Sequence, residues 1–461
     1  MVPISVDRTH LLVAINVILN YIKIMKRYFI DELKRWKNSK NRKPLLLYGA
    51  RQVGKTWLVR NFAELEYNSL IELNFLTDKS LKKIFENNIS PEYIIRQLEL
   101  RFNVKIDPNR TLLFFDEIQE SQRAMDSLKS FDDMQSGSAG KNYHIVAAGS
   151  FLGVTSGRRP AGQIEQLTLF PMSFCEFLDA IGYEILSNAI KLRDTDALSG
   201  SAALLETFLK QYYFSGGMPA AVNEYTLSGD LEKVRKIQNE LLISYKGDFS
   251  KHINDPRTAP KIRMLWDSIP LHLVKENKKF IYKNIKSGGR AAEFENALQW
   301  LVDTGLVYKI NKVETPKLPL KMHYKEDYFK LYMIDIGLFC AHAEIRPSDI
   351  MSAGADIVDD MNGALAEQFV CQELKASGIS PLFFWRRYGS TAEIDFIIQG
   401  DNDVIPIEVK SSKHTKSQSL KVYMNEYSPK CAVRTSLKNF GFKDNLYSVP
   451  LYMISQFLVK Y

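Results

Sequence analysis

Short, continuous apolar runs alternate with helix-like stretches along the first 170 residues of the chain. Largely apolar runs lie at residues 45–48, 111–115 and 144–148, and a strand-like segment follows at 165–170. Runs of this length are typical of parallel strands that are buried on both faces of a sheet. The pattern therefore predicts an α/β region that is built on a parallel sheet.

Helical spacing dominates the middle of the chain. Apolar residues recur three and four positions apart at 203–213 and 231–245. Between these stretches, the sequence Ser-Gly-Gly-Met-Pro at 215–219 has the composition of a helix stop followed by a turn. We interpret this segment as turn chemistry, and residues 171–284 as a mainly helical region.

A helix, a glycine and a strand follow in that order. The helix is predicted at 291–303, Gly305 ends it, and the strand is predicted at 306–310. This order favours a winged-helix-like connector. Several lysines lie close by, at positions 309, 312, 317, 321 and 325. Such a unit either binds DNA or joins two domains, and the sequence leaves both interpretations open.

Two alternating strands near the C-terminus predict a β-hairpin. The strands are expected at 391–399 and 404–410, and Gly-Asp-Asn-Asp between them is typical hairpin-turn chemistry. A turn centred between residues 401 and 402 places Asp395 directly opposite Glu408. Lys410 lies two residues further on and shares the same face of the sheet.

Composition and length narrow the class of protein. A chain of 461 residues with 45% hydrophobic and 25% charged residues is typical of a globular protein with about three domains. The net charge of +8 is a weak indication of an anionic partner. The four cysteines form no C-x-x-C pair, which disfavours a zinc site or a disulfide framework and fits a cytoplasmic location.

The first 24 residues differ from the rest of the chain. Their apolar stretch, 11–24, contains Asn16, Asn20 and Lys23 and is too short and too polar to span a bilayer, so no membrane partner is expected. We expect these residues to be an extension and Met25 to be the native start. An amphipathic helix is predicted to run from there to about Trp36.

The sequence Gly-Ala-Arg-Gln-Val-Gly-Lys-Thr at 49–56 follows the first apolar run and precedes a helix. This is the pattern and the context of a phosphate-binding P-loop, whose backbone N–H groups surround phosphate oxygens. Lys55 is expected to reach the β- and γ-phosphates of ATP, and Thr56 to bind Mg²⁺. The simpler alternative is a chance glycine-rich turn. The candidate nucleotide-binding residues are Gly49, Ala50, Arg51, Gln52, Val53, Gly54, Lys55, Thr56, Trp57 and Asp116.

Polar residues end the next two predicted strands. Asp116 and Glu117 follow the run at 111–115, and Ser150 follows the run at 144–148. Asp116 is a candidate Mg²⁺ ligand, and Glu117 is a candidate base that orients and deprotonates the attacking water. Ser150 is a candidate contact for the γ-phosphate or the water. The alternatives are a helix cap at Asp116 and a simple turn residue at Ser150.

Further motifs give the chain a specific resemblance. Gly157-Arg158-Arg159 follows the strand that ends in Gly-Ser, and Leu-x-Pro-Met-Ser-Phe-x-Glu-Phe follows at 169–177. Together with the P-loop, this order resembles prokaryotic AAA-type ATPases that carry a C-terminal domain of unknown function. The resemblance runs from about Met25 to the C-terminus. It implies a helical lid and an arginine, Arg158 or Arg159, that neutralises γ-phosphate charge in cis or in trans, although a surface role stays open.

The C-terminal hairpin has a second resemblance. Asp395, the Glu408-x-Lys410 sequence and an upstream helical Glu367 are similar to the PD-(D/E)XK nuclease superfamily. This resemblance implies that Glu367, Asp395 and Glu408 bind Mg²⁺ and that Lys410 is catalytic in phosphodiester hydrolysis. Two alternatives stay open: a surface salt-bridge cluster, and a nuclease-like fold that is used only for binding.

These observations predict an α/β protein with a P-loop NTPase sheet, a helical lid, a winged-helix-like connector and a nuclease-like α/β domain. The chain is expected to hydrolyse ATP with Mg²⁺ and to act on or bind DNA or RNA. The alternative is a slow nucleotide-controlled switch with a C-terminal docking module for a partner protein, and an oligomer is open in either case. The expected divisions are 1–24, 25–170, 171–284, 285–350 and 351–461.

Overall fold

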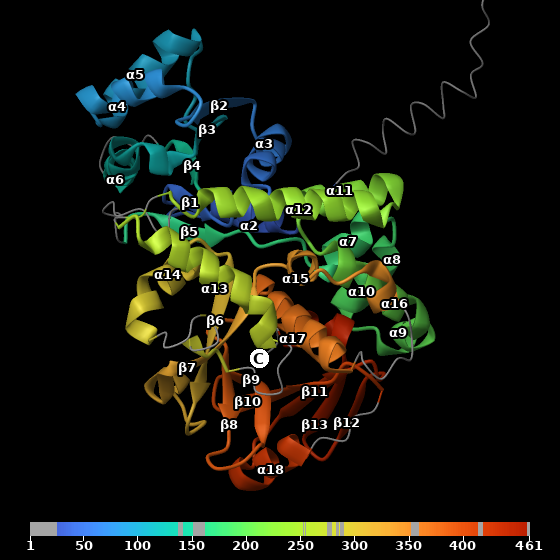
Figure 1. Cartoon of the computed structure of the whole chain (residues 1–461). Coiled ribbons are helices and arrows are strands. Elements are labelled where there is room, and N and C mark those ends of the chain that lie inside the picture. The colour runs from blue at the N-terminus through green and yellow to red at the C-terminus, as the bar shows by residue number, and fades with distance from the viewer. Residues whose placement is uncertain are drawn as a thin grey trace, which may run out of the picture.

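The computed structural model describes residues 25–136, 142–150, 162–251, 253, 255–273, 279–282, 285, 290–351, 359–413 and 418–458. Within these ranges the chain forms two β-sheets, each with helices packed against it (Figure 1). No helix in the described ranges is long and apolar enough to cross a membrane.

The first sheet is parallel and has the strand order β2-β3-β4-β1-β5. The predicted apolar runs form its three central strands, which are almost entirely buried. β5 alternates between half-buried and exposed residues because it lies at the edge of the sheet. The strands are β1 (Leu45–Tyr48), β2 (Ser69–Asn74), β3 (Thr111–Asp116), β4 (His144–Ala148) and β5 (Glu165–Thr168).

Helices cover both faces of this sheet, as the continuous apolar strands predict. Leu45 and Leu47 of β1 pack with α2 and α3 on one face, whereas Leu46 packs in the cluster of α4, α5 and α6 on the other. Strand residues alternate between faces, so one apolar strand supplies both cores. The helices are α2 (Phe29–Lys37), α3 (Lys55–Glu66), α4 (Lys82–Asn87), α5 (Pro91–Phe102) and α6 (Gln122–Ser136).

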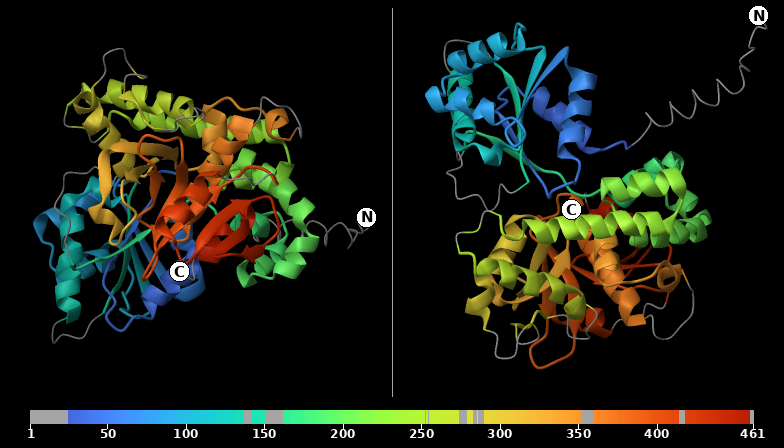
Figure 2. Two further views of the ribbon diagram at one scale, coloured as in Figure 1. Left: turned by 90° about the horizontal axis from the view of Figure 1, so that it is seen from below. Right: turned by 45° about the horizontal axis from the view of Figure 1, so that its top comes forward.

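The middle of the chain is helical, as its spacing predicts. Its helices are α7 (Phe174–Ala180), α8 (Glu184–Leu192), α9 (Thr195–Gly200), α10 (Ala202–Ser215), α11 (Pro219–Ser228), α12 (Leu231–Asp248) and α13 (Thr258–Leu273). In the right view of Figure 2, α12 runs between the first sheet with its helices and the second sheet. Helices of this region contact the P-loop through Arg51 and Asp248, and they contact the second sheet through the packing of α13 against β7.

The second sheet is mixed and has the strand order β12-β13-β11-β10-β9-β8-β6-β7. Its strands are β6 (Val307–Val313), β7 (Tyr324–Met333), β8 (Phe383–Arg386), β9 (Glu393–Gln399), β10 (Val404–Val409), β11 (Ala432–Ser436), β12 (Gly441–Lys443) and β13 (Leu446–Pro450). The accompanying helices are α14 (Ala291–Asp303), α15 (Ile336–His342), α16 (Pro347–Met351), α17 (Asp359–Ala376), α18 (Gln418–Tyr427) and α19 (Ile454–Leu458).

The predicted division near residue 350 runs through this sheet. β6 pairs in parallel with β8, with Asn311 opposite Phe383 and Val313 opposite Trp385. The predicted connector therefore contributes two strands, β6 and β7, to the same sheet as the C-terminal hairpin. α14 has the predicted bounds, while the winged-helix assignment and the domain limits stay predictions.

The register of the C-terminal hairpin agrees with the sequence analysis. Val404 of β10 pairs with Gln399 of β9, and Ile407 pairs with Phe396. Extended by one step, this register sets Glu408 opposite Asp395. The predicted register of the hairpin is therefore confirmed.

A tight glycine contact joins the helical region to the second sheet. The backbone N–H of Gly217 donates to Asp335 Oδ2 at 2.6 Å, and Met172 N–H donates to the carbonyl oxygen of Gly217 at 2.7 Å. The other carboxylate oxygen of Asp335 accepts the N–H of Leu338 and caps α15. The interpretation of this segment as plain turn chemistry is therefore too narrow, because the turn also forms the junction between three parts of the chain.

Glu373 of α17 is a buried carboxylate at a second junction. It accepts a hydrogen bond from Phe174 N–H at the start of α7 (2.9 Å) and one from the Ser455 hydroxyl (3.1 Å). Burial raises the pKa of Glu373 to about 7, although the two hydrogen bonds act in the opposite direction. The folded protein thus holds a proton here that the unfolded chain releases at lower pH.

This pKa shift predicts a specific pH dependence of stability. Because the folded-state pKa of Glu373 is raised, its contribution favours folding at low pH and is lost as the pH rises from about 4.5 to about 7. Glu373→Gln is expected to reduce the loss of unfolding free energy across this window by an amount on the order of 3 kcal/mol. Denaturant unfolding at several pH values measures the effect, with exposed Glu64→Gln as the control. Equal pH slopes for Glu373→Gln and the wild type would contradict this assignment.

Candidate active site

The P-loop connects β1 to α3 in the predicted strand, loop and helix order. Gly54 is the residue before α3 and has φ of 98°, in the left-handed region that glycine adopts without a side-chain clash. The N-terminus of α3 therefore begins directly at Lys55 and points its free N–H groups toward the loop. This geometry suits a bound phosphate.

The side chain of Lys55 is buried at the centre of the loop. Its ammonium group donates to the carbonyl oxygens of Gly49 (2.8 Å) and Ala50 (2.9 Å). It also lies 3.2 Å from the hydroxyl oxygen of Ser150, at the end of β4. Burial lowers the pKa of Lys55 to about 8, while Glu117 and Asp116 oppose that shift. The structure thus brings Lys55 and Ser150 together, and their catalytic roles stay predictions.

Thr56 and Asp116 also meet, from α3 and β3. The Thr56 hydroxyl donates to Asp116 Oδ2 at 3.1 Å, and Asn74 Nδ2 of β2 donates to the same oxygen at 3.1 Å. Burial, together with the adjacent charge of Glu117, raises the pKa of Asp116 to about 6. The Thr56 hydroxyl and the Asp116 carboxylate both offer oxygen ligands, and a cation would compensate the negative charge of the carboxylate. The pair therefore fits Mg²⁺.

Glu117 lies at the carboxyl end of β3 with φ of 50°, a left-handed conformation that is uncommon for a residue with a side chain. Gln119 Nε2 donates to Glu117 Oε2 at 2.6 Å and orients the carboxylate. Backbone strain of this kind is typical of functional positions. Arg158 and Arg159, the candidate charge-neutralising residues, lie outside the described residues.

Two arginine contacts of the P-loop were missed by the sequence analysis. Arg27 donates to the carbonyl oxygen of Val53 at 3.2 Å and forms a buried ion pair with Glu176 at 3.1 Å. Arg51 donates to both carboxylate oxygens of Asp248, at 2.8 and 2.7 Å, at the end of α12. The two carboxylate partners, Glu176 and Asp248, are more than 100 residues away from their arginines in sequence, so no local pattern could reveal these ion pairs.

The Arg51–Asp248 contact predicts an energetic coupling between the P-loop and α12. In a double-mutant cycle of Arg51→Ala and Asp248→Asn, we expect a coupling of about 1 kcal/mol in the free energy of unfolding. The matched control is the more exposed Arg60–Glu72 pair, whose coupling is expected to be smaller. Additive single-mutant effects at Arg51 and Asp248 would show that the contact carries no energy.

The four residues of the nuclease-like resemblance lie at the second sheet: Asp395 on β9, Glu408 on β10, Lys410 directly after β10, and Glu367 on α17. Lys410 Nζ lies 2.8 Å from Glu408 Oε1, and Asp395 Oδ2 accepts the N–H of Val409 at 2.8 Å. Burial alone would lower the pKa of Lys410, but the charges of Glu408, Asp395 and Glu367 raise it overall. The predicted hairpin face and the helical glutamate are therefore neighbours.

These carboxylates do not fit the Mg²⁺ that the resemblance implies. Among the described residues, no group of three or more His, Cys, Asp or Glu side chains is arranged to hold a metal ion. Lys330 of β7, absent from the sequence analysis, is fully buried beside them. Its ammonium lies 2.5 Å from Glu393 Oε1 and 3.8 Å from Glu367 Oε2. The prediction of Glu367, Asp395 and Glu408 as a metal-binding set thus lacks support from the geometry.

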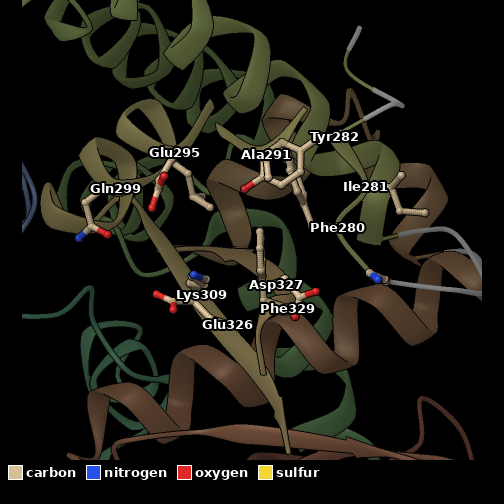
Figure 3. Close-up of a pocket in the computed structure, with 12 residues that line it drawn as sticks. Phe280, Ile281, Tyr282, Ala291, Glu295, Gln299, Lys309, Glu326, Asp327 and Phe329 are labelled. Carbon is tan, nitrogen blue, oxygen red and sulfur yellow. The ribbon is translucent and has the colours of Figure 1, made fainter. Parts of the chain in front are cut away.

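Two cavities lie beside α14 and β6. The larger, of about 730 Å³, is separate from the P-loop and is lined by aromatic residues such as Phe280 and Phe329 together with Glu295, Lys309 and Glu326 (Figure 3). The smaller, of about 200 Å³, lies between the P-loop side and the turn after α14. The lining of this smaller cavity includes Gly49, Ser150, Thr304 and Gly305. The P-loop therefore faces the start of β6 directly.

Comparison with known families identifies the region that contains the P-loop. Residues 41–178 match the family described as "AAA domain". They form an AAA-type P-loop ATPase domain. The AAA domain contains the P-loop, the Asp116–Glu117 pair and Ser150, and its match ends within α7. Residues 206–349 and 362–454 match two families that are described only as domains of unknown function, DUF8612 and DUF4143.

Solved structures similar to the chain include other ATPases. A Walker-type ATPase of Pyrococcus abyssi is 14% identical, with 69% of this chain and 96% of that chain covered and a TM-score of 0.42. The Orc1 protein of Aeropyrum pernix in complex with DNA is 12% identical, with 69% and 93% covered and a TM-score of 0.26. The RuvB Holliday junction branch migration motor of Thermotoga maritima is 14% identical, with 63% and 90% covered and a TM-score of 0.28. No curated protein matches the chain.

Proposed function

We propose that the AAA domain binds ATP with Mg²⁺ and hydrolyses it to drive a change in the rest of the chain. The observation that carries this proposal is the convergence of Lys55, Thr56, Ser150, Asp116 and Glu117 at the carboxyl ends of three parallel strands. Ligands of open α/β sheets bind at this edge. An Asp-Glu pair at the strand end favours water as the phosphoryl acceptor.

Each residue of the site has a proposed role. Lys55 exchanges its carbonyl partners in the loop for the β- and γ-phosphate oxygens of ATP. Thr56 and Asp116 hold Mg²⁺, which neutralises phosphate charge when bound. Glu117, oriented by Gln119, accepts a proton from the attacking water, and Ser150 contacts the γ-phosphate or that water.

For the C-terminal region we propose docking of a partner without nucleic-acid cleavage. Two observations support this choice over a metal-dependent nuclease: the buried ammonium of Lys330 beside the carboxylates, and the ion pair of Lys410 with Glu408. The contact of Arg51 with Asp248 gives the P-loop a direct connection to α12. In this proposal the chain is a nucleotide-controlled switch whose partner is a protein or a nucleic acid.

The test of the proposed ATPase is turnover of ATP with Mg²⁺ by the full chain and by Lys55→Ala. Lys55→Ala is expected to lose binding of a fluorescent ATP analogue and to lower turnover by about 100-fold or more, because it removes a charge from the phosphates. Exposed Lys83→Ala on α4 is the matched control and is expected to behave as the wild type. Unchanged turnover in Lys55→Ala would overturn the proposal.

A further inference from the structure

The nuclease-like face of the second sheet contains an unexpected lysine. Lys330 lies on β7 and is fully buried, and the side chain of Phe384 is stacked beneath its ammonium at 4.8 Å from the ring centroid. An isolated buried ammonium is costly, so lysine is rarely found in this position without compensating charges. The compensation here comes from carboxylates.

Carboxylates from two other elements surround the Lys330 ammonium. Glu393 at the start of β9 is 2.5 Å away, and Glu367 of α17 is 3.8 Å away. Burial by itself would lower the pKa of Lys330, but the charges of Glu393, Glu367 and Asp395 raise it above its ordinary value. The two ion-pair distances place the positive charge of the Lys330 ammonium among the carboxylates of the face.

Protein donors already contact the carboxylates that the resemblance assigns to a metal. Glu367 Oε2 accepts a hydrogen bond from the Tyr332 hydroxyl at 3.1 Å as well as facing Lys330. Glu408 is paired with Lys410, and Asp395 accepts the backbone N–H of Val409. A divalent cation would have to displace these donors and also approach the buried positive charge of Lys330. The divalent cation and the Lys330 ammonium would then be two positive charges close together in a buried site, where they repel each other strongly.

We propose that Lys330 is a built-in cation that replaces the divalent metal of the nuclease-like face. The C-terminal region then keeps the carboxylate arrangement of a nuclease but is held together without metal. It neither binds a divalent cation nor cleaves phosphodiesters. This proposal is independent of ATP hydrolysis in the AAA domain, because no residue of the P-loop takes part in it.

Binding of Mn²⁺ to the nucleotide-free full chain tests the proposal. Asp116→Asn serves as the common background, because it removes the candidate metal ligand of the P-loop. In this background, paramagnetic resonance or calorimetry is expected to detect no saturable Mn²⁺ site that depends on Asp395. Lys330→Gln, which removes the positive charge, is expected to gain such a site, and adding Asp395→Ala is expected to remove it again.

Lys330→Arg is the matched control, because it keeps the positive charge and is expected to bind no Mn²⁺. Asp395-dependent Mn²⁺ binding with Lys330 in place would overturn the proposal, as would a folded Lys330→Gln variant that binds none. Circular dichroism establishes folding. If Lys330→Gln does not fold, Mn²⁺ binding is compared between the Asp116→Asn protein and the same protein with Asp395→Ala added. A saturable site that is lost with Asp395 would still overturn the proposal.

Cleavage of single- and double-stranded DNA and of RNA gives an independent measurement. The otherwise unchanged chain is expected to leave all three intact with Mg²⁺ or Mn²⁺. Cleavage that disappears in Asp395→Ala but persists in Lys55→Ala would overturn the proposal for the C-terminal region and leave the proposed ATPase untouched. Loss of ATP turnover in Lys55→Ala, together with no cleavage by the unchanged chain, would support both proposals.

Discussion

Replacing Glu117 with glutamine is expected to slow ATP hydrolysis by about two orders of magnitude or more while ATP binding persists. Glutamine keeps the size of the side chain and its contact with Gln119 but cannot accept the proton of the attacking water. General-base catalysis contributes rate factors of about 10² to 10⁴, which sets the expected loss. Single-turnover hydrolysis of bound ATP measures the chemical step separately from product release.

The neighbouring Glu120→Gln is a close control for this prediction. Glu120 follows three residues later, and its carboxylate pairs with Lys82 of α4 at 3.7 Å. It is expected to leave the rate nearly unchanged. A normal hydrolysis rate in Glu117→Gln would refute the assignment of Glu117 as the base and point to another group at the end of the parallel sheet.

Replacing Gly216 with alanine is expected to destabilise the protein by about 3 kcal/mol or more. Gly216 has φ of 68° and ψ of −165°, a combination that only glycine adopts readily. A Cβ atom there would lie 2.2 Å from Asp335 Oδ1 and 2.7 Å from the backbone nitrogen of Gly337. Backbone strain and overpacking each cost about 1 to 3 kcal/mol, and here they act together.

Denaturant unfolding of Gly216→Ala measures this loss, and Gly229→Ala provides the comparison. Gly229 also has a positive φ, of 63°, but a Cβ atom there would meet no other atom within 4 Å. Gly229 has ψ of 3°, so the control carries only the milder strain of the left-handed helical region, and the excess loss at Gly216 reports its more strained backbone together with the contact with Asp335 and Gly337. Equal losses in both variants would show that the junction tolerates a methyl group.

The features that the sequence predicts well are those whose residues lie close together along the chain. The P-loop and the register of the C-terminal hairpin are of this kind, because a short turn determines which residues face each other. The strand ends also predict that Asp116 and Ser150 approach the P-loop, because the carboxyl ends of parallel strands meet at the same edge of a sheet.

The features that the sequence does not predict depend on distant strands and helices. Lys330 lies between Phe329 and Leu331 in the buried half of β7, and by the alternation of a strand a lysine between two apolar residues is expected to face solvent. Its burial follows only from the way β6 joins β7 to β8, which no local pattern specifies. The same holds for the pairing of Arg51 with Asp248, because helix spacing does not reveal which end of α12 meets the P-loop.

The parallel pairing of β6 with β8 limits how this chain could be divided or recombined. A segment exchanged between related proteins at residue 350 would separate β6 from β8 and leave two open strand edges. Such edges readily pair with other chains and promote aggregation. The C-terminal region is therefore expected to be inherited together with β6 and β7, as one unit that begins before Val307.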